Sequence, residues 1–212
     1  MILYGAGGAA LVALAVVLIV VLAAGKSGKA GSASRIRSTL TAAGCTLETS
    51  RAAPYAQHIS SLSQSVTYKT FPPVSGRHYY IPAIWGNYTQ AVDPRQAVHN
   101  EEHGGIDIWL GPGVSATDRK QISDFYDESP NAMLVTPIEN TSKGVGYPKH
   151  APPDSKIYLT AWTTKKPRDY TNATAVIAMC PHFSEKAFTA FRDEFRGQGP
   201  ERFPVDILKP GT

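Results

Sequence analysis

The segment DPRQAVHNEEHGGIDIWL, residues 93–110, carries the strongest structural signals in the chain. Asp93 is a typical N-cap residue, and Pro94 fits the first position of a helix. Gly104 is a natural C-terminal stop for that helix. Residues 106–110 alternate in polarity and are β-branched, which predicts a strand. The segment therefore predicts a short helix that leads directly into a strand.

The rest of the chain predicts one small α+β domain with a mixed or antiparallel sheet and two or three helices. Further helical patterns cover residues 34–43, 118–128 and 184–196. Further strand patterns cover residues 132–136, 156–162 and 174–179. Residues 45–92 and 137–155 are rich in loop-forming residues, so we expect extended segments and loops there.

Composition and charge are those of a globular domain. The chain of 212 residues is 42% hydrophobic and 18% charged, which excludes a disordered protein. Its net charge is +4, and four basic residues lie beside the hydrophobic leader: Lys26, Lys29, Arg35 and Arg37. The remaining domain is close to neutral and lacks a basic stripe with interleaved aromatic residues. We therefore expect no nucleic-acid partner.

The N-terminal leader, residues 1–24, is apolar and carries no charged side chain. Its apolar stretch of about 23 residues is long enough to cross a bilayer as a helix. We expect an uncleaved transmembrane anchor, which makes the membrane a partner. A cleaved signal peptide that ends near residues 21–23 is the alternative. Residues 25–34 are predicted to be a flexible linker, and residues 35–212 the domain itself.

Two signals for the topology of the domain disagree. The basic residues follow the leader, and the positive-inside rule would then keep the domain in the cytoplasm. The chain has only two cysteines, Cys45 and Cys180, and an even count in a tethered chain suggests a disulfide in an oxidising compartment. Two unrelated buried thiols are the alternative. We favour a single-pass protein of the cell membrane whose domain lies outside the cytoplasm.

Two short segments, HNEEHGG at 99–105 and FPPVSGRHY at 71–79, hold three of the six histidines. His99 and His103 would share one face of the predicted helix. Histidine is the commonest side-chain metal ligand, and imidazole suits zinc and copper. Glu102 is expected to be a further ligand or to hydrogen-bond to one. The predicted copper or zinc site consists of His58, His78, His99, His103 and Glu102.

Three functions are compatible with this histidine block. The leading hypothesis is binding of a transition metal for delivery or storage. The second is a cell-envelope interaction module in which the histidines and Glu102 only satisfy one another. The third is a zinc-dependent hydrolase, because His99, Glu102 and His103 form the reversed zincin motif HxxEH with Glu102 as the base. Its third ligand would come from Glu185 or Glu194. The sequence leaves open whether the protein is an enzyme, and binding without catalysis is favoured.

A weaker indication of a metal site lies near the end of the domain. Met179, Cys180 and His182 resemble a copper ligand set. A disulfide at Cys180 would remove its thiolate, so we expect a structural role for this segment.

The blocks PP-x-SG-x-H at 72–78 and VHN-x-EHGG at 98–105 resemble an uncharacterised, mainly bacterial membrane-anchored family, domain of unknown function 3105. The resemblance extends from Gly44 to Glu201. It implies a membrane-anchored, exported domain and no established activity. Val74 replaces the usual threonine, and Glu101 replaces the usual leucine. The second change makes the block more acidic and suggests that a different face is exposed.

Overall fold

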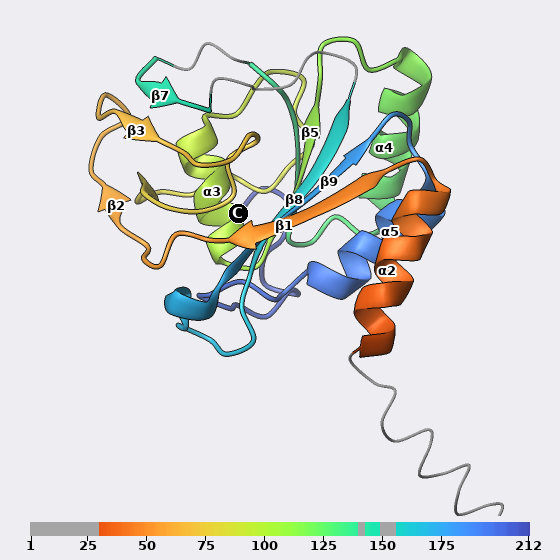
Figure 1. Ribbon diagram of the computed structural model, residues 1–212. Coiled ribbons are helices and arrows are strands. Elements are labelled where there is room, and N and C mark those ends of the chain that lie inside the picture. The colour runs from red at the N-terminus through yellow and green to blue at the C-terminus, as the bar shows by residue number, and fades with distance from the viewer. Residues whose placement is uncertain (1–29, 140–142, 149–155) are drawn as a thin grey trace, which may run out of the picture.

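The computed structural model describes residues 30–139, 143–148 and 156–212. These residues form four α-helices, nine strands and one 3-10 turn (Figure 1). In chain order the elements are α2 (Ala30–Ala42), β1 (Thr46–Arg51), β2 (His58–Ile59), β3 (Val66–Thr67), β4 (His78–Tyr79), α3 (Pro94–Glu102), β5 (Ile106–Leu110), α4 (Ala116–Glu128), β6 (Met133–Pro137), β7 (Val145–Gly146), β8 (Ile157–Thr163), η1 (Tyr170–Asn172), β9 (Thr174–Cys180) and α5 (Glu185–Phe195).

The main sheet has five strands in the order β1-β9-β8-β5-β6. Strands β5 and β6 run parallel, whereas the other neighbouring pairs are antiparallel, so the sheet is mixed. Two parallel pairs of short strands, β2-β4 and β3-β7, lie apart from this sheet. The α+β class and the mixed sheet predicted from the sequence are confirmed. The described residues form four helices rather than two or three, because α2 is also held in place by its buried Ile36 and Leu40.

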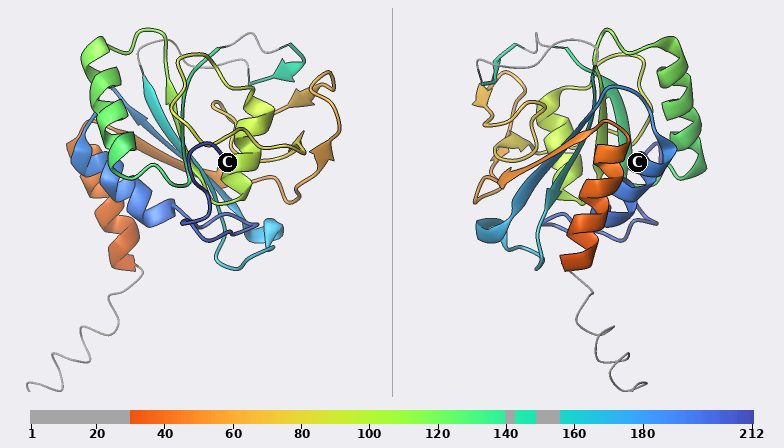
Figure 2. Two further views of the ribbon diagram at one scale, coloured as in Figure 1. Left: turned by 180° about the vertical axis from the view of Figure 1, so that it is seen from behind. Right: turned by 45° about the vertical axis from the view of Figure 1, so that its right-hand side comes forward.

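The main sheet is covered on both faces. Helices α2, α4 and α5 lie on one side, and α3 lies on the other side with the short strands (Figure 2). We call the core between the sheet and α2, α4 and α5 the first core, and the core on the α3 side the second core. Side chains alternate along each strand, so Ile106 and Ile108 pack in the first core while Trp109 packs in the second. All five residues of β5 are buried for this reason. Each core therefore depends on a different face of the same strands.

The local signals around α3 act as the sequence predicts. The Asp93 side chain accepts a hydrogen bond of 2.9 Å from the Arg95 amide, and Pro94 occupies the first turn. The helix is followed by Gly104, whose φ of +97° lies in the left-handed region. The chain then enters β5 at Ile106. The expected helix and strand are both confirmed.

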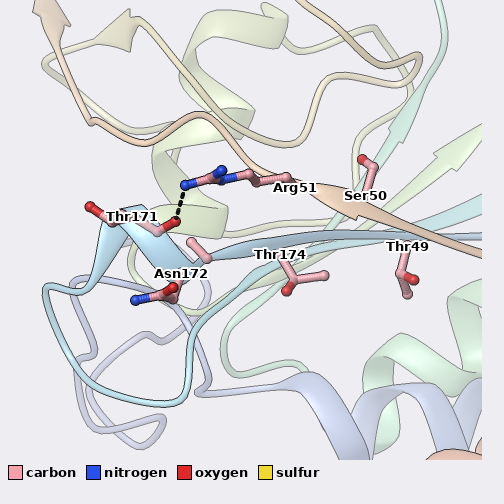
Figure 3. A pocket seen from close by; sticks show the side chains of 7 residues that line it. Thr49, Ser50, Arg51, Thr171, Asn172 and Thr174 are labelled. Atoms are coloured by element: carbon pink, nitrogen blue, oxygen red, sulfur yellow. Dashed lines mark hydrogen bonds between the residues drawn. The ribbon is translucent and has the colours of Figure 1, made fainter.

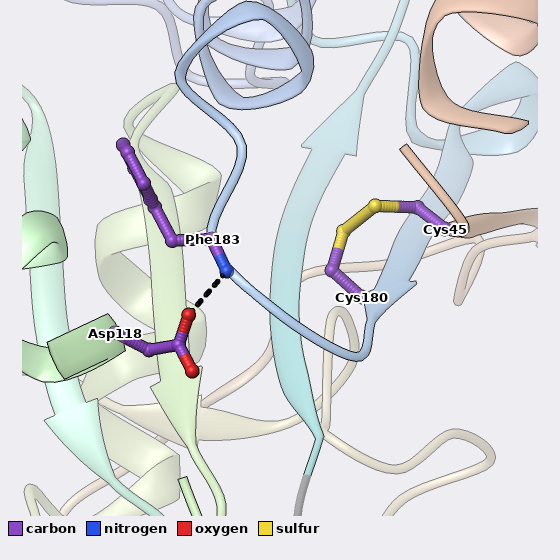
Figure 4. The surroundings of a disulfide bond; sticks show 4 residues. All are labelled: Cys45, Asp118, Cys180 and Phe183. Atoms are coloured by element: carbon purple, nitrogen blue, oxygen red, sulfur yellow. Dashed lines mark hydrogen bonds between the residues drawn. A yellow bond between two sulfur atoms is a disulfide. The ribbon is translucent and has the colours of Figure 1, made fainter. Parts of the chain in front are cut away.

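A disulfide joins Cys45, just before β1, to Cys180 at the end of β9 (Figure 4). The two cysteines are 135 positions apart in the sequence and are buried in the first core. Beyond this bond, the Phe183 amide donates a 2.8 Å hydrogen bond to Asp118. The predicted pairing of the two cysteines is confirmed. Because Cys180 is in the disulfide, it has no thiolate to offer a copper ion together with Met179 and His182.

The predicted membrane span at residues 1–24 lies outside the described residues. None of the helices within residues 30–139, 143–148 and 156–212 is both long and apolar enough to span a bilayer. Helix α2 begins at Ala30, earlier than the helix expected from residue 34.

Candidate metal centre

Four of the predicted ligands converge between α3 and the β2-β4 pair. His58 and His78 stand opposite each other in the register of β2 and β4. His99 and Glu102 lie three positions apart on α3, which places them on the same side of that helix. One ligand atom from each of the four residues lies within 4.8 Å of the others. We call this group the inner cluster: His58, His78, His99 and Glu102.

The His78 ring is fully buried, and both of its nitrogens face polar atoms. Its Nδ1 lies 2.8 Å from the carbonyl oxygen of Gly76, which can only accept a hydrogen bond. Nδ1 therefore carries a proton. Its Nε2 lies 2.9 Å from Oε2 of Glu102. In the neutral ring this Nε2 presents a lone pair, so the contact with Glu102 calls for a proton or a metal ion between the two atoms.

His99 is anchored in the same way. Its Nδ1 donates a 2.8 Å hydrogen bond to the carbonyl oxygen of Tyr79, the residue after His78. Burial lowers the pKa of His99 to about 4, and this outweighs the hydrogen bond to Tyr79, which raises it. The ring is therefore neutral at pH 7, and its Nε2 offers a lone pair.

Glu102 supplies the negative charge of the inner cluster. Its side chain is almost completely buried, and its Oε1 accepts a 2.6 Å hydrogen bond from the Tyr170 hydroxyl. Burial alone raises the pKa of Glu102, but interactions with His78 and the Tyr170 hydrogen bond lower it to about 2. The carboxylate is therefore ionised, and its Oε2 faces the imidazoles.

His58 forms the solvent side of the inner cluster. Its side chain is 48% exposed, and its Nε2 lies 3.7 Å from Oε2 of Glu102. The ring stacks on His99 with the centroids 4.8 Å apart, and it meets the edge of His78 at the same distance. The cluster is thus buried on the helix side and accessible past His58.

His103 belongs to a second group of ligand atoms. Its Nε2 lies 3.1 Å from Nε2 of His99 and 3.3 Å from Oε2 of Glu201. We call His99, His103 and Glu201 the outer cluster, and its ligand atoms also lie within 4.8 Å of one another. The structure thus divides the four predicted histidines between two groups that share His99.

Glu201 is a functional candidate that sequence reasoning missed. It reaches His103 because the segment after α5 packs directly against the end of α3. The Gly197 amide donates to the Gly104 carbonyl at 2.8 Å, and the Glu201 amide donates to the Glu102 carbonyl at 2.9 Å. A Cβ atom on Gly199 would lie 2.3 Å from the Gly104 nitrogen, so only glycine permits this approach. No local sequence pattern around Glu201 predicts its contact with His103.

Glu101 contradicts the expectation that its acidity exposes a different helix face. The side chain is fully buried and accepts a hydrogen bond from the Thr160 hydroxyl. Burial and repulsion from Asp107 raise the pKa of Glu101 well above its ordinary value, and burial does the same for Asp107. A raised pKa favours the uncharged form of a carboxyl group, which is compatible with the interior position of Glu101.

The remaining candidate residues lie elsewhere. Glu185 and Glu194 belong to α5, which covers the opposite face of the sheet from α3 (Figure 2). They join neither group of possible metal ligands. The His182 side chain is 77% exposed and lies 3.3 Å from Asp118. None of these residues completes the predicted centre.

A separate hollow lies beside the end of β1 and the turn η1 (Figure 3). Hydroxyl and amide side chains surround it, and Arg51 donates a 3.2 Å hydrogen bond to the Thr171 carbonyl. It contains none of the predicted ligands.

Fold and site together define a small α+β domain with a buried histidine–carboxylate cluster beside one helix. Residues 58–187 match the family described as Protein of unknown function (DUF3105), and this is more than half of the chain. The chain therefore belongs to that family. The matched part includes the whole inner cluster and His103, but it contains neither Cys45 nor Glu201, so it is shorter than the resemblance from Gly44 to Glu201. No curated protein and no solved structure matches the chain.

Proposed function

We propose that the domain binds one zinc or copper ion at the inner cluster. The observation that carries this proposal is the anchoring of its two buried imidazoles. Both His78 and His99 donate Nδ1–H to a backbone carbonyl at 2.8 Å. Histidines that ligate metals almost always donate their other ring nitrogen in this way, which fixes the tautomer and aims Nε2 at the ion.

The chemistry of the donor atoms favours Zn(II) or Cu(II). Three imidazoles and one carboxylate form a nitrogen-rich set of borderline softness, which suits these ions. Both cysteines are joined in the disulfide and supply no thiolate. A soft Cu(I) site built on thiolate is therefore disfavoured.

The competing hypothesis is a purely structural cluster in which a proton takes the place of the ion. In that case His78 is a charged imidazolium paired with Glu102 at 2.9 Å. This pairing would satisfy His78, and in this arrangement Nε2 of His99 accepts a 3.1 Å hydrogen bond from Nε2 of His103. It leaves Nε2 of the half-exposed His58 at 3.7 Å from Glu102, beyond hydrogen-bonding distance. A metal ion would use all four side chains at once.

The hydrolase hypothesis is weaker for a specific reason. A general base works best when its pKa is near the working pH. The pKa of Glu102 is lowered to about 2, so this carboxylate is a poor base at neutral pH. Its contacts with His78 and Tyr170 suit a ligand better than a group that activates water.

We also propose that the N-terminal apolar segment anchors the domain outside the cytoplasm. The disulfide supports this proposal, because such bonds persist in oxidising compartments. The domain would then capture or deliver metal ions at the cell envelope.

Calorimetric titration of Zn(II) and Cu(II) into the full chain, purified without a polyhistidine tag, tests the metal proposal. We expect one ion per chain. The affinity should fall at least about tenfold in His78→Gln and in Glu102→Gln, because each removes a ligand. His182→Ala, which removes an exposed histidine outside the cluster, is the matched control. Equally weak binding by wild type and both variants would refute the metal site.

A further inference from the structure

The outer cluster holds a second set of converging ligand atoms next to the inner one. We propose that His99, His103 and Glu201 form an outer cation site that hands a transition-metal ion to the inner cluster through the shared His99 ring. This inference rests on the proposed function, because the inner cluster must be able to receive the ion.

The geometry of His99 makes the two sites alternatives. Its Nδ1 is committed to the Tyr79 carbonyl, so Nε2 is the nitrogen left for a metal. That nitrogen lies 3.1 Å from Nε2 of His103, and His99 belongs to both groups of possible ligands. One lone pair holds one ion at a time. We therefore expect an ion to move from one side of the His99 nitrogen to the other, and each chain to hold a single ion.

Exposure gives this movement a direction. The side chains of His103 and Glu201 are 15% and 39% exposed, whereas those of His78 and Glu102 are 0% and 2% exposed. A carboxylate at the solvent boundary attracts cations and raises their rate of capture. Apart from the half-exposed His58, the inner ligands are buried, so the outer cluster is suited to capture an ion and the inner cluster to retain it.

The outer cluster is also held in a fixed position. The Glu201 amide is bonded to the Glu102 carbonyl, so the backbones of an outer ligand and an inner ligand are directly linked. The Phe203 ring packs against His103 with the centroids 4.6 Å apart. Because of these contacts, Glu201 and His103 face each other without any rearrangement of the chain.

Stopped-flow loading with Co(II), whose visible absorption reports its ligands, tests the handover in the full chain. We expect Glu201→Gln to slow loading about tenfold or more, because the captured ion loses its charged ligand. Glu128→Gln removes one exposed carboxylate from α4 and is the charge-matched control. Loading of Glu201→Gln at the rate of Glu128→Gln would refute the handover and show that ions enter past His58.

A second set of variants isolates the outer cluster at equilibrium. His78→Gln, and independently Glu102→Gln, should still bind one Co(II), more weakly and with a changed spectrum. This residual binding should vanish when Glu201→Gln is added to either variant. Two ions per wild-type chain, or residual binding that survives Glu201→Gln, would overturn the shared site. A wild-type chain that binds one ion and loses it completely in His78→Gln would leave the inner site standing and remove the outer one. No ion in the wild type would overturn both proposals.

Discussion

Neighbouring glutamates on α3 have opposite electrostatic environments. Glu101 lies in the interior beside Asp107, and its pKa is raised well above the ordinary value. Glu102 lies beside His78 and Tyr170, and its pKa is lowered to about 2. Consecutive helical residues point in directions about 100° apart, so adjacent side chains meet different surroundings. The pKa values of these two glutamates therefore depend on their tertiary contacts and not on residue type alone.

The lowered pKa of His99 predicts a loss of stability in acid. Between pH 6.5 and about 4, the unfolded chain binds a proton at residue 99 that the folded chain does not. The free energy of unfolding therefore falls as the pH falls through this window, by up to about 3 kcal/mol. Urea unfolding at pH 7 and pH 5 in the presence of a chelator should show this loss in wild type and a smaller loss in His99→Gln. Identical losses in both proteins would contradict the assignment.

Sequence reasoning named most residues of the candidate centre but not how the structure groups them. His99 and Glu102 were predicted because histidine beside a carboxylate on one helix face is a local pattern. His58 and His78 were included because histidine is the commonest side-chain metal ligand. The burial of Glu101 was not predicted, because its pairing with Asp107 and Thr160 depends on which strands lie under α3. The contact between His103 and Glu201 was not predicted either, because it joins segments that are far apart in the chain.

At the scale of elements, strong local signals were reliable and weak ones were not. The N-cap at Asp93 predicted α3, and the alternation in residues 106–110 predicted β5, as the structure confirms. The two-residue strands β2 and β4 have no periodicity to detect, and they pair across a separation of 20 residues within a loop-rich segment. Yet it is their register that places His58 opposite His78. The strands β2 and β4, which bring His58 and His78 together, were thus the elements least detectable in the sequence.

The close approach of the final segment to α3 predicts the effect of Gly199→Ala. The added Cβ would meet the Gly104 nitrogen at 2.3 Å and the Glu102 carbonyl oxygen at 2.4 Å, so the two backbones must separate. We expect a loss of about 1–3 kcal/mol in the free energy of unfolding, as for other overpacked sites. Chemical denaturation measures this loss. A variant as stable as wild type would mean that the segment does not pack as described.

At the scale of the whole molecule, two cores share one mixed sheet, and a disulfide closes most of the chain into a loop. The bond joins positions 135 residues apart, which links the start of the domain to the strand before α5. Helix α3, which carries His99 and Glu102, lies on the opposite face of the sheet from α2, α4 and α5 (Figure 2). The face that carries the site is therefore built largely from α3 and loops, whereas the other face is built from three helices.

The long loop predicts that the disulfide contributes strongly to stability. Loop-closure arguments give an upper figure of about 4–5 kcal/mol for a loop of this length. Replacing both cysteines by serine should lower the free energy of unfolding by up to this amount. Thiol counting in denatured, unreduced protein gives a direct check, and two free thiols per chain would show that the bond does not form.

The proposed topology predicts the result of reporter fusions at Thr212. A fused enzyme that is active only after export should be active, because we place the domain outside the cytoplasm. A fused reporter that works only in the cytoplasm should be inactive. The reverse result would support the positive-inside prediction from the basic residues that follow the leader.

The central claim is that an ion joins the imidazoles and the carboxylate of the inner cluster. Anomalous diffraction at the zinc edge, from untagged protein crystallised with Zn(II), tests it most directly. The account predicts one strong peak about 2.0–2.2 Å from Nε2 of His78, Nε2 of His99 and Oε2 of Glu102. A map with no peak there, in which His78 and Glu102 remain in direct contact at 2.9 Å, would contradict it.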